Sequence, residues 1–464
     1  MLHNSKHGAP CRIAAKLSLN RKLAFSILVM CVFTLTSEVS AQTMPQRPES
    51  PEISALATRI GNNDSTALSG FWSVVGQRHT PLIEALPGDP KHVLATFIWR
   101  GDASTTDVVL MAQPNGVEML HDSRSHLHRL LSTDLWYVTH RLPIDAEFSY
   151  LFAINPPSVA PVGPFANANV TVRLTTVADP LNPLQYRILT GPSRSIARMP
   201  AVPEDPWLGT SVDPADVREY TLHSTVLTGA GDRKVWVFMT PGDLHSPNLI
   251  LMLDSDIYMR AVPSTAILSK LYSAGKIRPT VAVFIGGGDG KTWLSDHYFN
   301  ETYVCFLADE VVPWAERELH FKADRRHTVI AGESIEGLTA SFAALIRPDI
   351  FGNVISQSGS FWINNHENDN GEPEWLARQF AKSKPLDVFF CLDVGQMEFT
   401  RNDGDRIFTP FIPGETNLLA SNRHLRDVLT AKGYKLFYSE VYGGHEPLRW
   451  TRTLPHLLLA TLSR

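Results

Sequence analysis

The chain has 464 residues, of which 44% are hydrophobic and 19% charged. This is ordinary globular composition, but the chain is too long for one ordinary core, so two domains plus a targeting segment are expected. The formal charge is −5, and no basic tract lies outside the first residues. Nucleic acid is therefore not expected as a partner.

Residues 1–41 have the pattern of a secretory signal peptide. Five basic residues precede the 13-residue apolar run LAFSILVMCVFTL, which is too short to span a bilayer comfortably. Val39-Ser40-Ala41 then offers small residues for cleavage before Gln42. Cleavage would change the charge from −5 to −9, because five basic side chains and one acidic side chain leave. Export to the periplasm, with no membrane span after removal, is expected; an uncleaved anchor is the alternative.

Residues 42–190 carry short apolar runs bounded by turn residues, such as HVLATFIWRG, LWYVTHRLP and EFSYLFAI. Their length and β-branched content predict an antiparallel β-sandwich domain. No pairing of a nucleophile with a base is apparent there, so the domain is expected to position or bind. Residues 191–217 are rich in Pro, Ser and Arg, which predicts a linker with Arg194 and Arg198 exposed to solvent.

In residues 218–464, strand-like runs alternate with helix-like stretches from the third run onward. Nearly continuous apolar strands separated by helices predict a mainly parallel sheet covered by helices on both faces. Two antiparallel strands followed by about six parallel strands is the α/β-hydrolase arrangement. The sequence therefore predicts an α/β fold of this class.

Ser334 lies where a nucleophile is expected in this fold. The β-run at 328–331 ends in Gly332-Glu333-Ser334 and passes directly into a helix-like stretch. A tight turn from strand to helix exposes the Ser hydroxyl, and the helix amino terminus favours developing negative charge. The motif G-x-S-x-G usually has Gly two residues after the Ser, whereas this chain has Glu336.

A general base and an acid should follow Ser334 in the order acid, then His. His445 comes after the strand-like run LFYSEVYGG and before the last helix-like stretch, which is the position of the base. Glu398, just beyond the run at 386–394, is the first candidate for the acid, with Asp393 and Asp403 as rivals. Together these residue types predict nucleophilic catalysis through an acyl-enzyme.

The oxyanion hole is expected from backbone N–H groups of Ile335 and of Ser255 or Asp256, which follow another strand-like run. This chemistry needs no cofactor, and no Cys and His cluster has zinc spacing, so no metal is expected. Cys305 and Cys391 remain after signal removal, as two buried thiols or one disulfide.

Several segments resemble the enterochelin (enterobactin) esterase family. They are AGESIEGLTASFAALIRPDIFGNVISQSGSFW around the Ser, GGHEPLRW around the His, LDVGQMEF at the acid, and ADPLNP and LMLDSDIY upstream. FWSVVGQRHTPLIE and LSTDLWYVTHRLP are similar to the amino-terminal sandwich of its two-domain members. The resemblance implies a serine esterase that hydrolyses a ferric or iron-free catecholate siderophore, with Ser334, Glu398 and His445 on the catalytic positions.

Three departures from the family pattern bear on the substrate. Trp293 stands where the family often has an Arg, Ser255 replaces a Gly at a strand end, and Glu336 replaces the elbow Gly. If the substrate is a catecholate, Trp293 and Trp362 would line its pocket, with Trp362 equally suited to core packing. The alternatives are an exported esterase for an acylated glycan or depsipeptide, and a catalytically impaired binding protein.

Overall fold

The computed structural model describes residues 49–112, 124–157, 175–187, 193–204, 206–207, 216–227, 232–287, 296–365, 372–398 and 418–463. All of them belong to one compact unit, Pro48–Arg464. The predicted signal peptide and Trp293 lie outside the described residues. In the described part of the chain, no helix combines the length and apolar character needed to cross a membrane.

The amino-terminal region is a β-sandwich of two antiparallel sheets. The first sheet has the order β1-β2-β5-β4, and the second has the order β3-β6-β9-β8 with β7 paired to β6. Apolar side chains from β2 and β6 meet between the sheets, among them Phe97 and Phe152. The strands are β1 (Leu82–Ala85), β2 (His92–Arg100), β3 (Val108–Ala112), β4 (His128–Arg129), β5 (Leu135–Pro143), β6 (Glu147–Ile154), β7 (Thr176–Val177), β8 (Gln185–Tyr186) and β9 (Arg194–Arg198).

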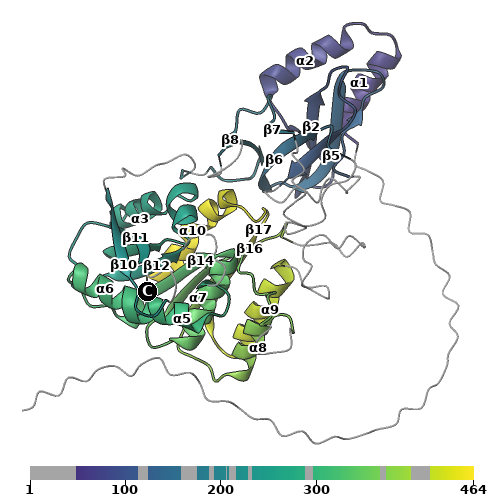
Figure 1. The fold of residues 1–464 in the computed structure, drawn as a ribbon. Coiled ribbons are helices and arrows are strands. Elements are labelled where there is room, and N and C mark those ends of the chain that lie inside the picture. The colour runs from purple at the N-terminus through teal and green to yellow at the C-terminus, as the bar shows by residue number, and fades with distance from the viewer. Residues whose placement is uncertain are drawn as a thin grey trace, which may run out of the picture. The chain divides into compact units, whose positions relative to one another are not determined.

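Two helices that the sequence did not predict precede the sandwich, α1 (Pro51–Gly61) and α2 (Ala67–Arg78). They pack on sheet residues such as Ile98 and Leu135 through an apolar cluster that includes Leu56 and Phe71. Figure 1 shows both helices in purple beside the strands that they cover. The segment FWSVVGQRHTPLIE, whose resemblance suggested sandwich structure, thus begins in a helix.

The prediction of a linker over 191–217 is wrong at residues Arg194–Arg198, which form β9 and pair with β6. Arg194 was expected in solvent but is 7% exposed, because the strand carries it inward and its Nε donates to Ser149 Oγ at 2.7 Å. Arg198 is half-buried and pairs with Glu147 at 2.5 Å. The sandwich therefore extends to at least Arg198.

The carboxy-terminal region is built on one eight-stranded sheet of order β10-β11-β13-β12-β14-β15-β16-β17. Strand β11 is antiparallel to both of its neighbours, β10 and β13. The remaining six strands, β13-β12-β14-β15-β16-β17, are mutually parallel. The strands are β10 (Val217–His223), β11 (Asp232–Met239), β12 (Asn248–Leu253), β13 (Thr280–Ile285), β14 (Thr328–Glu333), β15 (Asn353–Gln357), β16 (Phe389–Gly395) and β17 (Lys435–Val441). The predicted α/β-hydrolase fold is confirmed.

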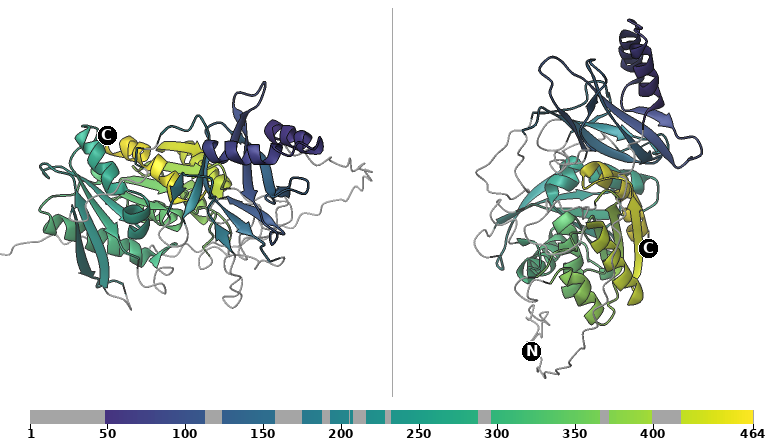
Figure 2. Two further views of the ribbon diagram at one scale, coloured as in Figure 1. Left: turned by 90° about the horizontal axis from the view of Figure 1, so that it is seen from above. Right: turned by 90° about the vertical axis from the view of Figure 1, so that its right-hand side faces the viewer.

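Helices cover both faces of this sheet, as nearly continuous apolar strands require. One apolar cluster joins α3 and α10 to the sheet, and the other joins the remaining larger helices to the opposite face. Figure 2 shows α10 (yellow) beside the strands from two directions. The helices are α3 (Ser264–Ser273), α5 (Glu301–Cys305), α6 (Val312–Glu318), α7 (Ser334–Ile346), α8 (Trp375–Lys382), α9 (Leu418–Ala431) and α10 (Pro447–Leu462), with short turns η3 (Ile257–Ala261), η4 (Phe306–Val311) and η5 (Arg325–His327).

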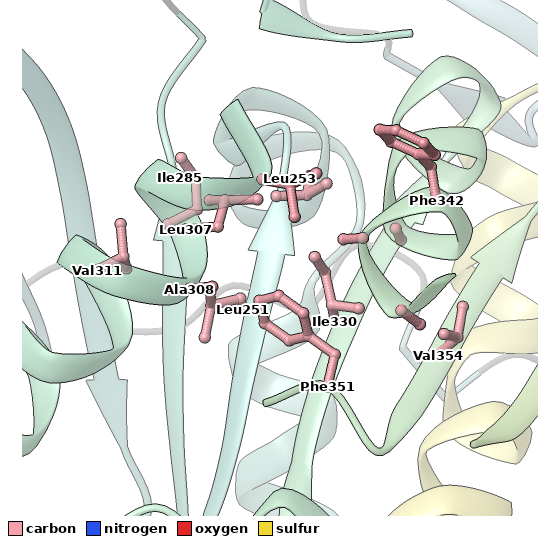
Figure 3. Close-up of a cluster of buried hydrophobic side chains, with 14 of the residues drawn as sticks. Leu251, Leu253, Ile285, Leu307, Ala308, Val311, Ile330, Phe342, Phe351 and Val354 are labelled. Atoms are coloured by element: carbon pink, nitrogen blue, oxygen red, sulfur yellow. The ribbon is translucent and has the colours of Figure 1, made fainter. Parts of the chain in front are cut away.

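The larger core fixes β14 and α7, which carry the elbow. Ile330 on β14 and Phe342 on α7 are 0% and 1% exposed and belong to one cluster with Leu251 and Leu253 of β12. Figure 3 shows Leu251 and Ile330 on neighbouring strands and Phe342 on the helix α7. Because parallel strands end at the same edge, the carboxyl ends of β12, β14, β15, β16 and β17 bring their loops together there.

Candidate active site

Ser334 occupies a strained turn between β14 and α7. Its φ is +52°, a left-handed conformation that costs a residue with a side chain free energy. At Gly332, a Cβ would lie 2.4 Å from the carbonyl carbon and oxygen of Glu336, so only glycine lets helix and strand approach this closely. The Ser334 side chain is half-buried and lies at the carboxyl edge of the sheet.

His445 faces the nucleophile from the loop between β17 and α10. Its Nε2 lies 3.0 Å from Ser334 Oγ, and its Nδ1 lies 2.8 Å from Glu398 Oε2. Its side chain is 24% exposed, whereas that of Glu398 is 1% exposed. The ring packs edge-on against Trp450, with centroids 5.2 Å apart. The structure thus joins Ser334, His445 and Glu398 in one hydrogen-bonded chain.

The Glu398 carboxylate is held by donors on its other oxygen. Oε1 accepts hydrogen bonds from Ser358 Oγ at 2.7 Å and Gly395 N at 2.8 Å, and lies 3.1 Å from Arg449 Nη2. Burial favours the neutral acid most strongly, but the positive charge of Arg449, the interaction with His445 and the hydrogen bond from Ser358 outweigh it, so the pKa of Glu398 lies below its usual value. Oε2 is left to hold the imidazole.

Gly395 allows the loops of Glu398 and His445 to meet. A Cβ at Gly395 would lie 2.2 Å from the carbonyl oxygen of Gly443 and 2.8 Å from Glu398 Oε1. Two backbone hydrogen bonds also join these segments, from Gln396 N to the carbonyl of Val441 at the end of β17 and from Met397 N to the carbonyl of Gly443. The acid is therefore fixed against the base by backbone contacts as well as by its own side chain.

The rivals for the acid have different positions. Asp393 is completely buried on β16, where Arg449 Nη1 donates to its Oδ1 at 2.9 Å, and the histidine is held by Glu398 instead. Asp403 lies outside the described residues. Cys391 is buried outside any disulfide and accepts a hydrogen bond from Thr461 Oγ1 at 3.0 Å, so it forms no disulfide with Cys305.

The predicted oxyanion donors lie on two neighbouring elements. Ile335 is in the first turn of α7, where backbone N–H groups have no helical carbonyl to bind. Ser255 and Asp256 follow β12, which pairs directly with β14. Asp254 has a φ of +59°, and its carboxylate accepts a hydrogen bond from the N–H group of Ile257 at 3.1 Å.

Two further residues surround the nucleophile. Ser360 Oγ lies 3.4 Å from Ser334 Oγ, and its N–H donates to the Ser334 carbonyl at 2.8 Å. Trp362, predicted as a pocket residue, is half-buried and packs against the larger apolar cluster. Sequence reasoning missed Ser360, although the run QSGSFW follows a buried strand in a way that marks the same edge of the sheet.

Glu336 is 2% exposed, and its Oε1 lies 3.5 Å from Nε2 of the buried His297. Together with Asp254 and Glu333 it offers three carboxylate oxygens within 4.8 Å of one another, the one such group among the described residues that could hold a cation. Burial, followed by the charges of Glu336 and Asp254, raises the pKa of Glu333 well above its usual value. A shared proton can therefore relieve the repulsion here without a metal.

Each of the two regions of the chain matches a known protein family. Residues 230–461 match the Esterase family ("Putative esterase"), and residues 94–208 match the family "Enterochelin esterase, N-terminal". The chain belongs to the enterochelin esterase family. As a member of this family it is an ester hydrolase.

The chain is similar to named enterobactin esterases from several bacteria. It is 29% identical over 414 residues to the iron(III) enterobactin esterase of Dickeya dadantii, covering 82% of this chain and 89% of the relative. It is 26% identical to the corresponding esterase of Escherichia coli O6:H1 over 76% of this chain and 88% of the relative.

Solved structures of enterobactin esterases share the fold. The protein from Shigella flexneri in the presence of enterobactin aligns with a TM-score of 0.63 and 24% identity, over 82% of this chain and 96% of that chain. The ferric enterobactin esterase from Salmonella typhimurium aligns with a TM-score of 0.63 and 23% identity, over 82% and 97%.

Proposed function

We propose that this esterase hydrolyses ester bonds of a catecholate siderophore through Ser334, His445 and Glu398. The observation that carries the proposal is the hydrogen-bonded chain of these three side chains, in a member of the enterochelin esterase family. The named relatives, which are iron(III) enterobactin esterases, support the substrate class. Iron would arrive as part of the substrate.

In this mechanism His445 acts as the general base. Its Nε2 takes the proton of Ser334 Oγ as the oxygen attacks the ester carbonyl, and Glu398 Oε2 stabilises the resulting imidazolium through Nδ1. The imidazolium then protonates the leaving alcohol, which leaves an acyl-enzyme. Water activated by the same imidazole hydrolyses the acyl-enzyme and restores the Ser334 hydroxyl.

The N–H group of Ile335 and one N–H after β12 would bind the oxyanion of the tetrahedral intermediate. Ile335 belongs to the first turn of α7, so the helix dipole adds to its hydrogen bond. The second N–H would come from Ser255 or Asp256, which follow β12 beside β14.

The substrate test compares enterobactin, ferric and iron-free, with a short-chain aryl ester, using the chain from Gln42 onward and its Ser334→Ala variant. We expect siderophore cleavage by the unaltered chain and a loss of about 10⁴-fold or more in the variant, because the nucleophile is absent. Cleavage of the aryl ester alone would overturn the siderophore substrate and favour an acylated glycan or a depsipeptide. Undiminished activity of Ser334→Ala would overturn the mechanism.

We also propose that residues 1–41 direct export and that the mature enzyme acts in the periplasm. The short apolar run, the basic residues before it and Val39-Ser40-Ala41 support this proposal. The test expresses the full chain with a carboxy-terminal tag and determines the compartment and the amino-terminal residue of the product. A periplasmic protein that begins at Gln42 is expected. A cytoplasmic protein that retains Met1 would contradict export.

A further inference from the structure

Arg449 lies in the first turn of α10, four residues after His445, and its side chain is 3% exposed. An arginine side chain is rarely so deeply buried unless it is paired. The proposed chemistry gives this residue no part in bond making, although it lies beside the acid of the hydrogen-bonded chain. The contacts of the Arg449 guanidinium therefore indicate its role beside Glu398.

The guanidinium of Arg449 is satisfied on every side. Nε donates to the carbonyl oxygen of Gly444 at 3.0 Å, and Nη1 donates to Asp393 Oδ1 at 2.9 Å. Nη2 donates to Ser358 Oγ and lies 3.1 Å from Glu398 Oε1. One side chain thus connects the loop of the base, the strand β16 and the acid.

Ser358 reinforces the connection between Arg449 and the acid. Its hydroxyl accepts from Arg449 and from Trp450 Nε1 at 2.9 Å, so its own proton is directed to Glu398 Oε1. Its backbone has a φ of +52°, and its N–H donates to the Asp393 carbonyl. The hydroxyl therefore has no freedom to turn away from the carboxylate.

Arg449 lies between two buried carboxylates, Asp393 and Glu398, and its positive charge offsets part of their negative charge. Asp393 is completely buried, and the side chain of Glu398 is 1% exposed. Without the guanidinium, two negative charges would compete for the same apolar interior, and protonation would relieve them. A protonated Glu398 could not stabilise an imidazolium at His445.

We propose that Arg449 is a positioning residue that keeps Glu398 ionised and directs its Oε2 to His445. The inference rests on the proposed role of the Ser334, His445 and Glu398 chain and adds to it the group that maintains its acid. The groups that face Glu398 are His445, Arg449, the Ser358 hydroxyl and the Gly395 N–H, with Asp393 on the far side of Arg449. The lowered pKa of Glu398 agrees with this arrangement.

The test compares four forms of the enzyme: unaltered, Arg449→Lys, Arg449→Met, and Arg449→Met combined with Asp393→Asn. The pH dependence of kcat/KM for an aryl ester is measured alongside the urea midpoint of unfolding. The double variant removes a cation and an anion together, which restores the net charge of the unaltered enzyme, whereas Arg449→Met alone leaves two buried carboxylates without their cation. Arg449→Lys keeps the charge but loses the planar fork.

We expect Arg449→Met to lower kcat/KM at neutral pH by about 10- to 100-fold, because general-base catalysis is weakened. The acid limb of its pH profile should move to higher pH, since Glu398 would be protonated over a wider range. Arg449→Lys should retain most of the activity. The double variant should recover the urea midpoint and part of the shift of the acid limb, while kcat/KM stays low because no guanidinium directs Glu398 Oε2 to His445.

Recovery of both the midpoint and kcat/KM in the double variant would overturn the proposal, because Arg449 would then serve folding alone. An unchanged pH profile in Arg449→Met would overturn it as well. If Arg449→Met does not fold, the lysine and double variants still decide between the two roles. Activity in Ser334→Ala would be a separate result that contradicts the proposed function itself.

Discussion

At the nucleophile, Glu336 shows how one unusual residue is accommodated without a change of fold. Its backbone lies against Gly332, so the close approach of helix and strand depends on glycine at the earlier position. Its carboxylate is buried beside His297 and near Glu333. The glycine usually found two residues after the Ser is therefore dispensable for the elbow geometry.

The carboxylate cluster predicts a pH-dependent stability. A carboxyl whose pKa is raised on folding stabilises the folded state below its unfolded pKa, and this contribution is lost as pH rises through the folded value. Glu333 has such a raised pKa, from burial first and from the charge of Glu336 second. The unfolding free energy should therefore fall as the pH rises above the unfolded pKa of Glu333. We expect this fall to be smaller in Glu336→Gln, because the repulsion between the two carboxylates is removed.

Urea unfolding at several pH values measures this slope, with Glu318→Gln on the exposed end of α6 as the control. The control should follow the unaltered enzyme. A slope in Glu336→Gln as steep as that of the unaltered enzyme would show that Glu336 and Glu333 do not repel each other in the folded state.

Sequence reasoning identified Ser334, His445 and Glu398 because each follows a strand-like run in a fixed chain order. It did not identify Arg449 or Ser358 as partners of the acid. Arg449 meets Asp393 and Ser358 across separations of 56 and 91 residues, and no local pattern encodes such pairs. Residues at strand ends are thus predictable, whereas the buried charges that support them require the folded chain.

Among the elements, the parallel strands were predictable from continuous apolar runs, whereas α1 and α2 were not. The segment around Phe71 mixes aromatic and β-branched residues, which favour strands, and its helix gains stability from packing on the sandwich. Ala67, Phe71 and Val75 are buried at a spacing of four, and this helical period was the available signal. The strand β9 was missed because its five residues lie in a segment rich in Pro and Ser.

The packing of α2 predicts that it can be loosened without affecting catalysis. Phe71 is 7% exposed and belongs to the cluster between the helices and the sandwich, which is separate from the two clusters of the larger sheet. We expect Phe71→Ala to destabilise this region by about 3 kcal/mol, because it removes a large buried ring. Val74 on the same helix is 46% exposed, so Val74→Ala is the matched control.

Limited proteolysis should cut Phe71→Ala within residues 51–78 much faster than it cuts the unaltered protein or the control. The kcat/KM of all three proteins for an aryl ester should agree within about twofold, as expected for sites without shared partners. A large loss of kcat/KM in Phe71→Ala would mean that α2 supports the active site.

At the scale of the whole molecule, Glu446 connects the sandwich to the loop of the base. This residue directly follows His445, is completely buried, and accepts hydrogen bonds from the N–H of Ser149 at 3.0 Å and from its hydroxyl. Ser149 lies on β6, and its hydroxyl also accepts from Arg194 Nε. Burial raises the pKa of Glu446 despite these contacts. The sandwich thus supplies the donors for a carboxyl adjacent to His445, the proposed general base.

This connection predicts that a substitution in the sandwich will reduce esterase activity. Ser149→Ala removes one donor to Glu446 and the hydroxyl that accepts from Arg194, at a cost of about 1–3 kcal/mol for buried groups left without a partner. We expect a lower kcat for an aryl ester with little change in KM, because His445 is less firmly held while the substrate-binding surface is unchanged.

Ser69→Ala, at an exposed position of α2, is the control and should behave as the unaltered enzyme. Calorimetry adds an independent measurement, since weaker coupling should separate the unfolding of the sandwich from that of the esterase region. An unaltered kcat together with one unaltered transition in Ser149→Ala would show that the sandwich does not hold the base.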